Sequence, residues 1–162
     1  MDTLSAALTV SEVTQADLDE WVSLALRLWP DEESNPEKAC LEMEAELLGI
    51  LRSPRDTGFL TRDRQGQAVG FINLSLCYDY VPGADHFPVA YVEGIYVADK
   101  SRRKGIGLAL LKRAEQWAID NGCTQLGSDV LIENEESCRF HTQVGFKEVE
   151  RVVCFIKDIE PQ

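Results

Sequence analysis

The sequence has few of the residues that build metal centres or disulfide frameworks. Its five cysteines are widely spaced and odd in number, contain no Cys-x-x-Cys pair, and have only two histidines to complete a metal site. We therefore expect free thiols, a cytoplasmic location and no bound metal. The start, Met1-Asp2-Thr3, has no Lys or Arg before its apolar residues. No uncharged apolar run approaches the roughly 20 residues of a membrane-spanning helix, so neither secretion nor membrane insertion is expected.

Basic residues are scarce relative to acidic ones. The chain has 16 Lys and Arg against 28 Asp and Glu, which gives a formal net charge of -12. No basic stripe is long enough to follow a phosphate backbone, so we do not expect a nucleic-acid partner. An acidic surface concentrates cations, and a small polycationic substrate fits this balance, although the charge could serve solubility alone.

Length and hydrophobic pattern predict one domain of mixed α and β structure. The 162 residues, 44% of them hydrophobic, suffice for one sizeable core. No repeat or linker divides them, so a single domain over residues 1–162 is expected, with residues 1–8 either flexible or part of the first strand. Helical spacing marks 14–29, 35–52, 106–120 and 135–144, and strand patterns mark 8–13, 57–62, 68–76, 89–97, 125–131 and 147–159. The predicted order, β-α-α-β-β-β-α-β-α-β, is an α/β (mixed α+β) fold with a central mixed sheet flanked by helices. The run at 89–97 is apolar enough for a strand buried on both faces.

A basic, glycine-rich loop follows the strand predicted at 89–97. It reads Arg102-Arg103-Lys104-Gly105-Ile106-Gly107, where glycines let the backbone approach a ligand and the next helix offers unpaired N–H groups. This combination is typical of an anion site and suits a diphosphate. A P-loop would need Gly-Lys-Ser/Thr, and a dinucleotide fold would need a third glycine where Leu110 stands, so both are excluded. An ordinary strand-to-helix turn is the competing interpretation.

The pattern Arg-x-x-Gly-x-Gly after a strand resembles the acyl-CoA signature of the GCN5-related N-acetyltransferases. The resemblance implies that acetyl-CoA is the co-substrate. Backbone groups of Ile95 and Val97 would then bind its pantetheine arm, the N–H groups from Arg103 to Leu108 would hold its diphosphate, and Asn134 would lie beside it. The implied cofactor-binding residues are Ile95, Tyr96, Val97, Arg102, Arg103, Lys104, Gly105, Ile106, Gly107, Leu108 and Asn134.

His141 stands where many members of that family have a tyrosine that reprotonates the thiolate. Imidazole titrates near neutrality, so His141 is a candidate general acid. The alternative is a helix-face residue satisfied by a neighbour. A covalent relay through Cys138, three residues earlier, is disfavoured because no cysteine has an evident basic partner.

Glu93 is the one charge in the apolar run at 89–97. An ionisable residue there is costly unless it is paired, solvated or functional. Because acetyl transfer needs a neutral amine, Glu93 is the candidate base, acting directly or through water; it could instead bind the substrate, or be a buried hydrogen-bonded glutamate. The expected mechanism is direct attack in a ternary complex, with a backbone N–H at or near Val97 stabilising the oxyanion.

From about residue 9 to 157 the chain is similar to the aminoglycoside 6'-N-acetyltransferases of the subgroup that forms compact homodimers. The matching stretches are Glu20-Trp21, Leu28-Trp29-Pro30, Asp79-Tyr80-Val81, Val92-Glu93-Gly94-Ile95, Ser128-Asp129, Glu133-Asn134 and Glu148-Val149-Glu150-Arg151-Val152. The match implies antibiotic resistance as the role and substrate contacts from Trp29, Tyr80, Glu93, Asp129 and Glu150. Carboxylates would bind ammonium groups and aromatic faces would stack on sugar rings. Without the resemblance, Trp29 would be interpreted as core, Asp129 as a turn residue and Glu150 as part of a solvated face.

Two other functions fit the same residues. The first is acetylation of another amine, such as a polyamine, an amino acid or a protein N-terminus, since acidity suits polyamines too. The second is a non-catalytic acyl-CoA sensor that keeps the glycine loop without the chemistry. Residues 130–132, Val-Leu-Ile, are more apolar than expected beside a sugar and could alter the drug range.

Overall fold

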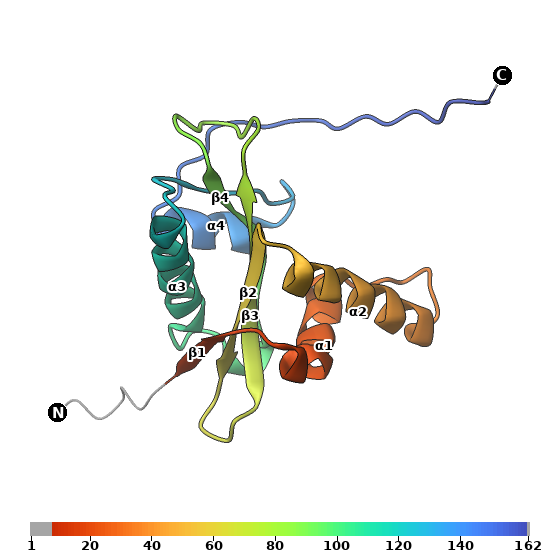
Figure 1. The fold of residues 1–162 in the computed structure, drawn as a ribbon, viewed down its shortest axis with the longest axis vertical. Coiled ribbons are helices and arrows are strands. Elements are labelled where there is room, and N and C mark those ends of the chain that lie inside the picture. Colours follow the sequence, from red (N-terminus) through yellow and green to blue (C-terminus); the bar gives the residue numbers. More distant parts are fainter. Residues whose placement is uncertain (1–7, 162) are drawn as a thin grey trace. The chain divides into compact units, whose positions relative to one another are not determined.

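The computed structural model describes residues 8–161, which form two compact units that meet in sequence at Asp129 and Val130. The expectation for residues 1–7 lies outside the described part of the chain. Figure 1 labels the helices and all strands except β5, with numbers in chain order. Those of the first unit are β1 (Thr9–Glu12), α1 (Leu18–Leu28), α2 (Pro36–Arg52), β2 (Asp56–Arg62), β3 (Ala68–Cys77), β4 (Val89–Val97), α3 (Ile106–Asp120) and β5 (Leu126–Ser128), with single 3-10 turns at Gln15–Asp17 and Asp99–Ser101.

The strands form one sheet in the order β1-β2-β3-β4-β5, antiparallel except for the parallel pair β4 and β5. The predicted mixed sheet flanked by helices is therefore confirmed, and the bounds of β2, β3 and β4 lie within one residue of the prediction. The strand expected at 125–131 is shorter, because β5 pairs with β4 over three residues only.

The helix starts follow local capping chemistry. The Asp17 carboxylate accepts hydrogen bonds from the backbone N–H and the hydroxyl of Thr14, which fixes the 3-10 turn that leads into α1. Asn35 accepts from the N–H of Lys38 at 2.8 Å, and Pro36 occupies the first helical position of α2. Both starts agree with the prediction, except that the first turn after Thr14 is 3-10 rather than α.

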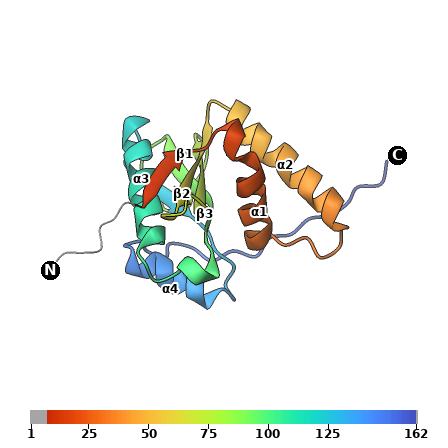
Figure 2. The same ribbon diagram turned by 90° about the horizontal axis from the view of Figure 1, so that it is seen from below.

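Helices cover both faces of the sheet. Figure 2 shows α1 and α2 on one side of the strands and α3 on the other. On the first side, buried Trp21 and Leu47 pack with Phe71 of β3. On the second, a Cβ at Gly70 would lie 3.3 Å from Ile106 of α3, so the glycine lets this helix approach closely. The surface that faces α1 and α2 also contains the candidate site.

One partly buried arginine joins α1 to the sheet. Arg62 of β2 forms 2.6 Å ion pairs with Asp17 and Glu20. Glu20 also accepts from the backbone N–H of Ala68, and this bond together with Arg62 lowers the pKa of Glu20 below its ordinary 4.5. Glu20 therefore contributes stability above about pH 4.5, which is lost as the pH falls through its lowered pKa.

Replacing Arg62 with leucine is expected to lower the free energy of unfolding by about 1–2 kcal/mol at neutral pH, because two charge-assisted bonds are lost. The loss should shrink as the pH falls from neutral to about 3, toward the lowered pKa values of Asp17 and Glu20, because protonation of these carboxylates removes the ion pairs of the unsubstituted protein as well. Urea unfolding at both pH values measures this. Arg64→Leu, at an exposed position of the next turn, is the control. An equal loss at both pH values would contradict the ion-pair account.

The second unit, Val130 onward, contains α4 (Glu135–Gln143), as predicted. The strand expected at 147–159 was wrong: none of residues 146–161 is in a strand. Its alternating β-branched and aromatic residues have the composition of a strand, but a strand also needs a backbone partner. The segment leaves Phe155 93% and Ile156 98% exposed.

Within residues 8–161, no helix is long and apolar enough to cross a membrane. In the same part of the chain, no three His, Cys, Asp or Glu side chains are grouped so that they could hold a metal ion.

Candidate functional site

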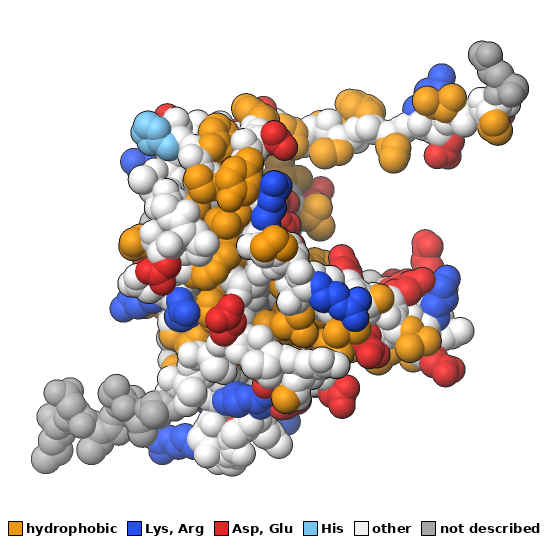
Figure 3. Space-filling view, viewed as in Figure 1, with side chains coloured by type: hydrophobic (Ala, Val, Ile, Leu, Met, Phe, Trp, Pro, Cys, Tyr) orange, Lys and Arg blue, Asp and Glu red, His pale blue; other side chains and the backbone are white. Residues whose placement is uncertain are grey.

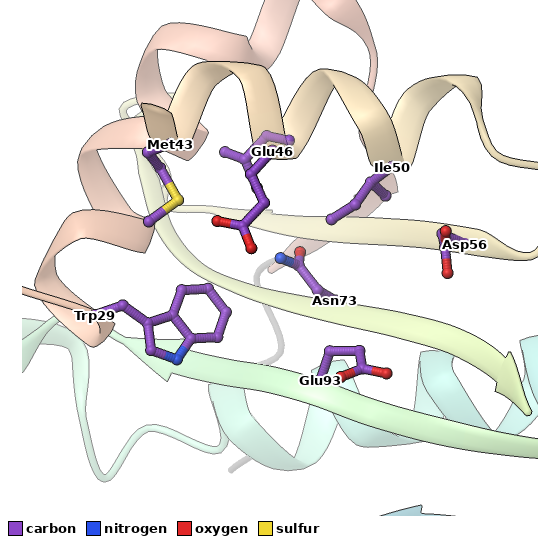
Figure 4. A pocket seen from close by; sticks show the side chains of 8 residues that line it. Trp29, Met43, Glu46, Ile50, Asp56, Asn73 and Glu93 are labelled. Atoms are coloured by element: carbon purple, nitrogen blue, oxygen red, sulfur yellow. The ribbon is translucent and has the colours of Figure 1, made fainter. Parts of the chain in front are cut away.

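A cavity of about 390 Å³ lies between the sheet and helices α1 and α2 (Figure 4). Its lining residues are Trp29, Met43, Glu46, Leu47, Ile50, Asp56, Asn73 and Glu93. Three of the eight are carboxylates and none is basic, so the cavity attracts cations. The space-filling view shows further acidic side chains over α2 (Figure 3).

Glu93 lies at an irregularity of β4. Asn73 of β3 is opposite Gly94 and Leu74 is opposite Val92, so Glu93 is the extra residue of a β-bulge. Bulges turn a side chain away from the regular alternation, and this one presents Glu93 at the cavity. The Glu93 carboxylate accepts a 2.5 Å hydrogen bond from the hydroxyl of Ser75.

The environment of Glu93 differs from the one predicted. The expected burial of the strand on both faces was wrong, because β4 is buried at Val89, Ala90 and Val92 but Glu93 is exposed. The alternative of a buried glutamate is therefore also wrong. Solvent and the Ser75 hydroxyl stabilise this charge at the cavity.

Trp29 ends α1 at the cavity wall. Its ring lies 6.0 Å from that of Phe71, and the side chain is 41% exposed, so it is not a core residue. A Cβ at Gly94 would meet the Trp29 ring at 2.4 Å. The indole therefore rests on the backbone of β4 next to Glu93 and leaves aromatic surface for a ligand.

Replacing Gly94 with alanine is expected to push Trp29 out of this position, because the new methyl group would overlap the ring. We expect the KM for the amine substrate that the sequence predicts to rise about fivefold, as stacking worth about 1 kcal/mol is lost, with a smaller change in kcat. Steady-state kinetics and Trp fluorescence measure the two effects. Gly49→Ala is the control, since a Cβ there meets nothing within 4 Å. Unchanged fluorescence and KM would contradict this placement of Trp29.

Asp129 follows β5 and accepts a 2.6 Å hydrogen bond from the hydroxyl of Tyr91. Burial, followed by this bond, raises the pKa of Tyr91, so the phenol stays protonated and remains a donor. Asp129 is thus a fixed carboxylate. It does not line the cavity, and neither does Tyr80, which lies in the loop after β3 and is 79% exposed.

Strand β4 has an open edge beyond Val92. Its pairing with β5 ends at Val92 and Ser128, so none of the described strands continues along the next five residues on that side. The N–H of Ala98 bonds to the carbonyl of Val69 on the opposite side. Antiparallel bonding alternates, so Ile95 and Val97 direct their backbone groups away from β3, toward the open edge. This is the geometry expected of a strand that binds a pantetheine amide.

The basic loop leads from that edge into α3. Gly105 has φ 78° and Arg103 has φ 61°, both in the left-handed region. The N–H of Ala109 bonds to the carbonyl of Gly105, so the three N–H groups before it lie at the open end of the helix. Those of Ile106, Gly107 and Leu108 can accordingly bind an anion, and exposed Arg103 and Lys104 add positive charge.

Arg102 bonds to the protein itself, whereas Arg103 and Lys104 add positive charge at the proposed anion site. Its Nε donates to the Val97 carbonyl at 3.0 Å, and its guanidinium pairs with Asp99 at 3.1 Å. The ring of Tyr96 lies 5.7 Å from it. The guanidinium thus ties the loop to the end of β4, and the Val97 carbonyl is engaged, which leaves the Val97 N–H for a ligand.

The remaining predicted residues lie in the second unit. Asn134 caps α4 by accepting from the N–H of Ser137 at 3.1 Å. His141 Nδ1 lies 2.7 Å from the carbonyl of Ser137, which can only accept, so Nδ1 carries a proton and donates it to this bond. Phe146 packs 5.1 Å from the imidazole. Glu150 is exposed in the extended segment that follows.

The sequence prediction did not include several residues at this site. Glu46, Asp56 and Asn73 line the cavity, while Ser75 and Tyr91 hold predicted carboxylates. A signal existed for Glu46, which shares the helical stripe of Met43, Leu47 and Ile50. Asn73 is likewise the one amide in an apolar strand, as Glu93 is the one charge in the next.

Comparison with known proteins gives a consistent result. The sequence profile described as Acetyltransferase (GNAT) family matches residues 17–146. The aminoglycoside N(6')-acetyltransferase type 1 of Serratia marcescens is 41% identical over 88% of this chain and 94% of its own. The crystal structure of aminoglycoside antibiotic 6'-N-acetyltransferase AAC(6')-Ih from Acinetobacter baumannii matches with a TM-score of 0.86 at 32% identity, covering 95% of this chain and 100% of its own. AAC(6')-Iy, in complex with the bisubstrate analog CoA-S-monomethyl-acetylneamine, has a TM-score of 0.83 at 31% identity, with the same coverage of 95% and 100%.

Proposed function

Because the chain belongs to the acetyltransferase (GNAT) family, we propose that it transfers acetyl from acetyl-CoA to the 6'-amine of aminoglycosides and so confers resistance. The observation that carries this proposal is the acidic cavity whose wall includes Glu93, on the same strand as an open backbone edge. A thioester along the edge and an amine in the cavity would meet at Glu93. The names of the relatives and the neamine-containing analog bound by AAC(6')-Iy support an aminoglycoside as that amine.

The chemistry begins with loss of a proton from the 6'-ammonium group. Glu93 accepts it, directly or through water, while the Ser75 bond holds the carboxylate in place. The neutral nitrogen then adds to the thioester carbonyl, and the N–H of Val97 or a neighbour stabilises the oxyanion. The C–S bond then breaks, the added nitrogen loses its second proton to solvent and becomes the amide nitrogen, and the thiolate of CoA takes a proton, for which His141 remains our proposed donor.

Acetyl-CoA would be held by the β4 edge and the loop after it. The N–H groups at the start of α3, with Arg103 and Lys104, fit its diphosphate. Arg102 holds this loop at the end of β4, because its guanidinium donates to the Val97 carbonyl and lies over the ring of Tyr96. We also keep Asn134 among the proposed cofactor-binding residues. Its side chain is held in one orientation by the hydrogen bond that it accepts from the N–H of Ser137.

The aminoglycoside would be bound by aromatic and acidic side chains. Trp29 supplies a ring face in the cavity next to Glu93. The proposed substrate-binding set also includes Asp129, whose carboxylate accepts the hydrogen bond from Tyr91. Its other members are the exposed side chains of Tyr80 and Glu150. Ammonium groups pair with the carboxylates, and sugar rings stack on the aromatic faces.

The test is an amine panel with acetyl-CoA in which thiol release is followed. Kanamycin and tobramycin should release CoA, whereas spermidine, free amino acids and a peptide N-terminus should give little. Turnover of spermidine or the peptide without turnover of kanamycin would reject the aminoglycoside assignment. Calorimetric binding of acetyl-CoA with no thiol release from any amine would favour the sensor alternative.

We also propose that the chain acts as a cytoplasmic homodimer of single domains. All five cysteines are free, which suits a reducing compartment. The extended segment after α4 exposes apolar side chains that a partner sheet could cover by strand addition. They are Val149, Val152, Val153, Phe155, Ile156 and Ile159.

Light scattering after size-exclusion chromatography is expected to give twice the monomer mass. Phe155→Asp, which places a charge among these apolar groups, should shift the protein toward monomer. Lys157→Asp, with a charge at an already polar position, is the control. A monomeric unsubstituted protein would contradict the dimer, and a dimer unaffected by Phe155→Asp would remove this segment from its interface.

A further inference from the structure

A buried amide forms part of the cavity lining. Asn73 of β3 is only 2% exposed, and its Oδ1 accepts a 3.1 Å hydrogen bond from the indole Nε1 of Trp21. Its Nδ2 therefore points the opposite way, and Figure 4 shows it directed into the cavity toward Glu46. Across the described residues, no hydrogen bond uses this nitrogen. The residue is almost fully buried, yet Nδ2 is not among the side-chain atoms enclosed without a partner, so this donor opens onto the cavity and can serve a ligand there.

The orientation of this amide is fixed. Trp21 is fully buried, and its indole N–H would lose its partner if the amide turned over. Gly58 of β2 provides the necessary space, since a Cβ there would lie 2.8 Å from the Trp21 ring and 3.1 Å from Asn73 Oδ1. The chain thus holds a hydrogen-bond donor in one direction before any ligand arrives.

A carboxylate faces this donor. Glu46 lies on the cavity side of α2 in the stripe of Met43, Leu47 and Ile50, and its side chain points toward Asn73 (Figure 4). In the described part of the chain it forms no ion pair or hydrogen bond, whereas Glu42 on the same helix pairs with Lys38. A donor and an anionic acceptor therefore line the same cavity, and within the described residues neither the Asn73 Nδ2 nor the Glu46 carboxylate has a protein partner.

We propose that Asn73 and Glu46 form a second substrate-binding position that selects polyhydroxylated amines over aliphatic ones. Asn73 Nδ2 donates to a hydroxyl or ring oxygen of the substrate, and Glu46 accepts from the neighbouring ammonium or hydroxyl group. Adjacent amino and hydroxyl groups of this kind are what an aminoglycoside carries. A polyamine offers no oxygen, so it would leave the Asn73 donor unpaired and bind less well. This inference rests on the proposed function.

The test measures binding of kanamycin and of spermidine by calorimetry without acetyl-CoA. Glu46→Gln is expected to weaken kanamycin binding about tenfold, because a charged hydrogen bond is lost. Asn73→Asp keeps the acceptor for Trp21 but replaces the donor with an acceptor. It should weaken kanamycin binding about tenfold without weakening spermidine. Glu42→Gln removes the same charge from an exposed position of α2 and should change neither.

If Asn73→Asp binds both amines more tightly, binding in the cavity depends on charge alone, and the inference is overturned. Kanamycin binding by Glu46→Gln and Asn73→Asp equal to that of Glu42→Gln would overturn it too. Circular dichroism and acetyl-CoA binding report whether each variant is folded. If Asn73→Asp does not fold, the test depends on Glu46→Gln, which changes an exposed side chain. If the unsubstituted protein fails to acetylate kanamycin, the proposed function fails. If it succeeds while both variants match the control, only the second binding position fails.

Discussion

Glu93→Gln is expected to lower kcat/KM for an aminoglycoside about 100-fold or more. Glutamine keeps the size of the side chain and can still bond to Ser75, but it cannot accept the proton of the ammonium group. The loss should be greatest at low pH, where more of the amine is protonated and removal of the proton matters most. A pH–rate profile measured with kanamycin tests this.

The control is Glu115→Gln, which removes one charge from an exposed position of α3, on the opposite face of the sheet. It should leave the profile unchanged. A Glu93→Gln variant with a raised KM but an unchanged pH–rate profile would mean that Glu93 binds the amine without accepting its proton. Full activity would remove Glu93 from the site altogether.

Gly105→Val is expected to raise the KM for acetyl-CoA about tenfold or more. Gly105 has φ 78°, and a β-branched residue pays roughly 1–2 kcal/mol in that region, so the loop changes conformation instead. The N–H groups at the start of α3 then lose their common direction and hold the diphosphate less well. Binding of CoA by calorimetry measures the effect directly.

The chain offers a matched control for this strain. Gly66, in the turn between β2 and β3, has φ 80°, and a Cβ at either Gly66 or Gly105 meets nothing within 4 Å. Gly66→Val should lower thermal stability by a similar amount while CoA binding stays normal. Equal CoA binding by both variants would contradict a phosphate-binding role for the loop.

Local signals in the sequence were sufficient for most of the fold. Thr14 with Asp17, and Asn35 with Pro36, fix helix starts through neighbours only a few residues away. The run at 89–97 was recognisable as a strand from composition alone. The segment at 147–159 has the same composition but no strand partner within the described residues, and pairing is a property of the tertiary or quaternary structure.

Candidate site residues could be picked out where one residue type departs from its surroundings. Glu93 and the basic glycine loop were identified in this way. The bulge that turns Glu93 outward depends on the register between β3 and β4, which the sequence does not reveal. Asn73 was missed because its role depends on Trp21, 52 residues away, and on the space left by Gly58.

The most direct test of the account is the structure of the product formed from kanamycin and acetyl-CoA. Mass spectrometry should show the addition of one acetyl group, and NMR should place it on the 6'-nitrogen, with one CoA thiol released for each product formed. An acetyl group on a different nitrogen would contradict the placement of the 6'-amine at Glu93. No acetylated kanamycin, under conditions in which another amine is acetylated, would contradict the aminoglycoside assignment itself.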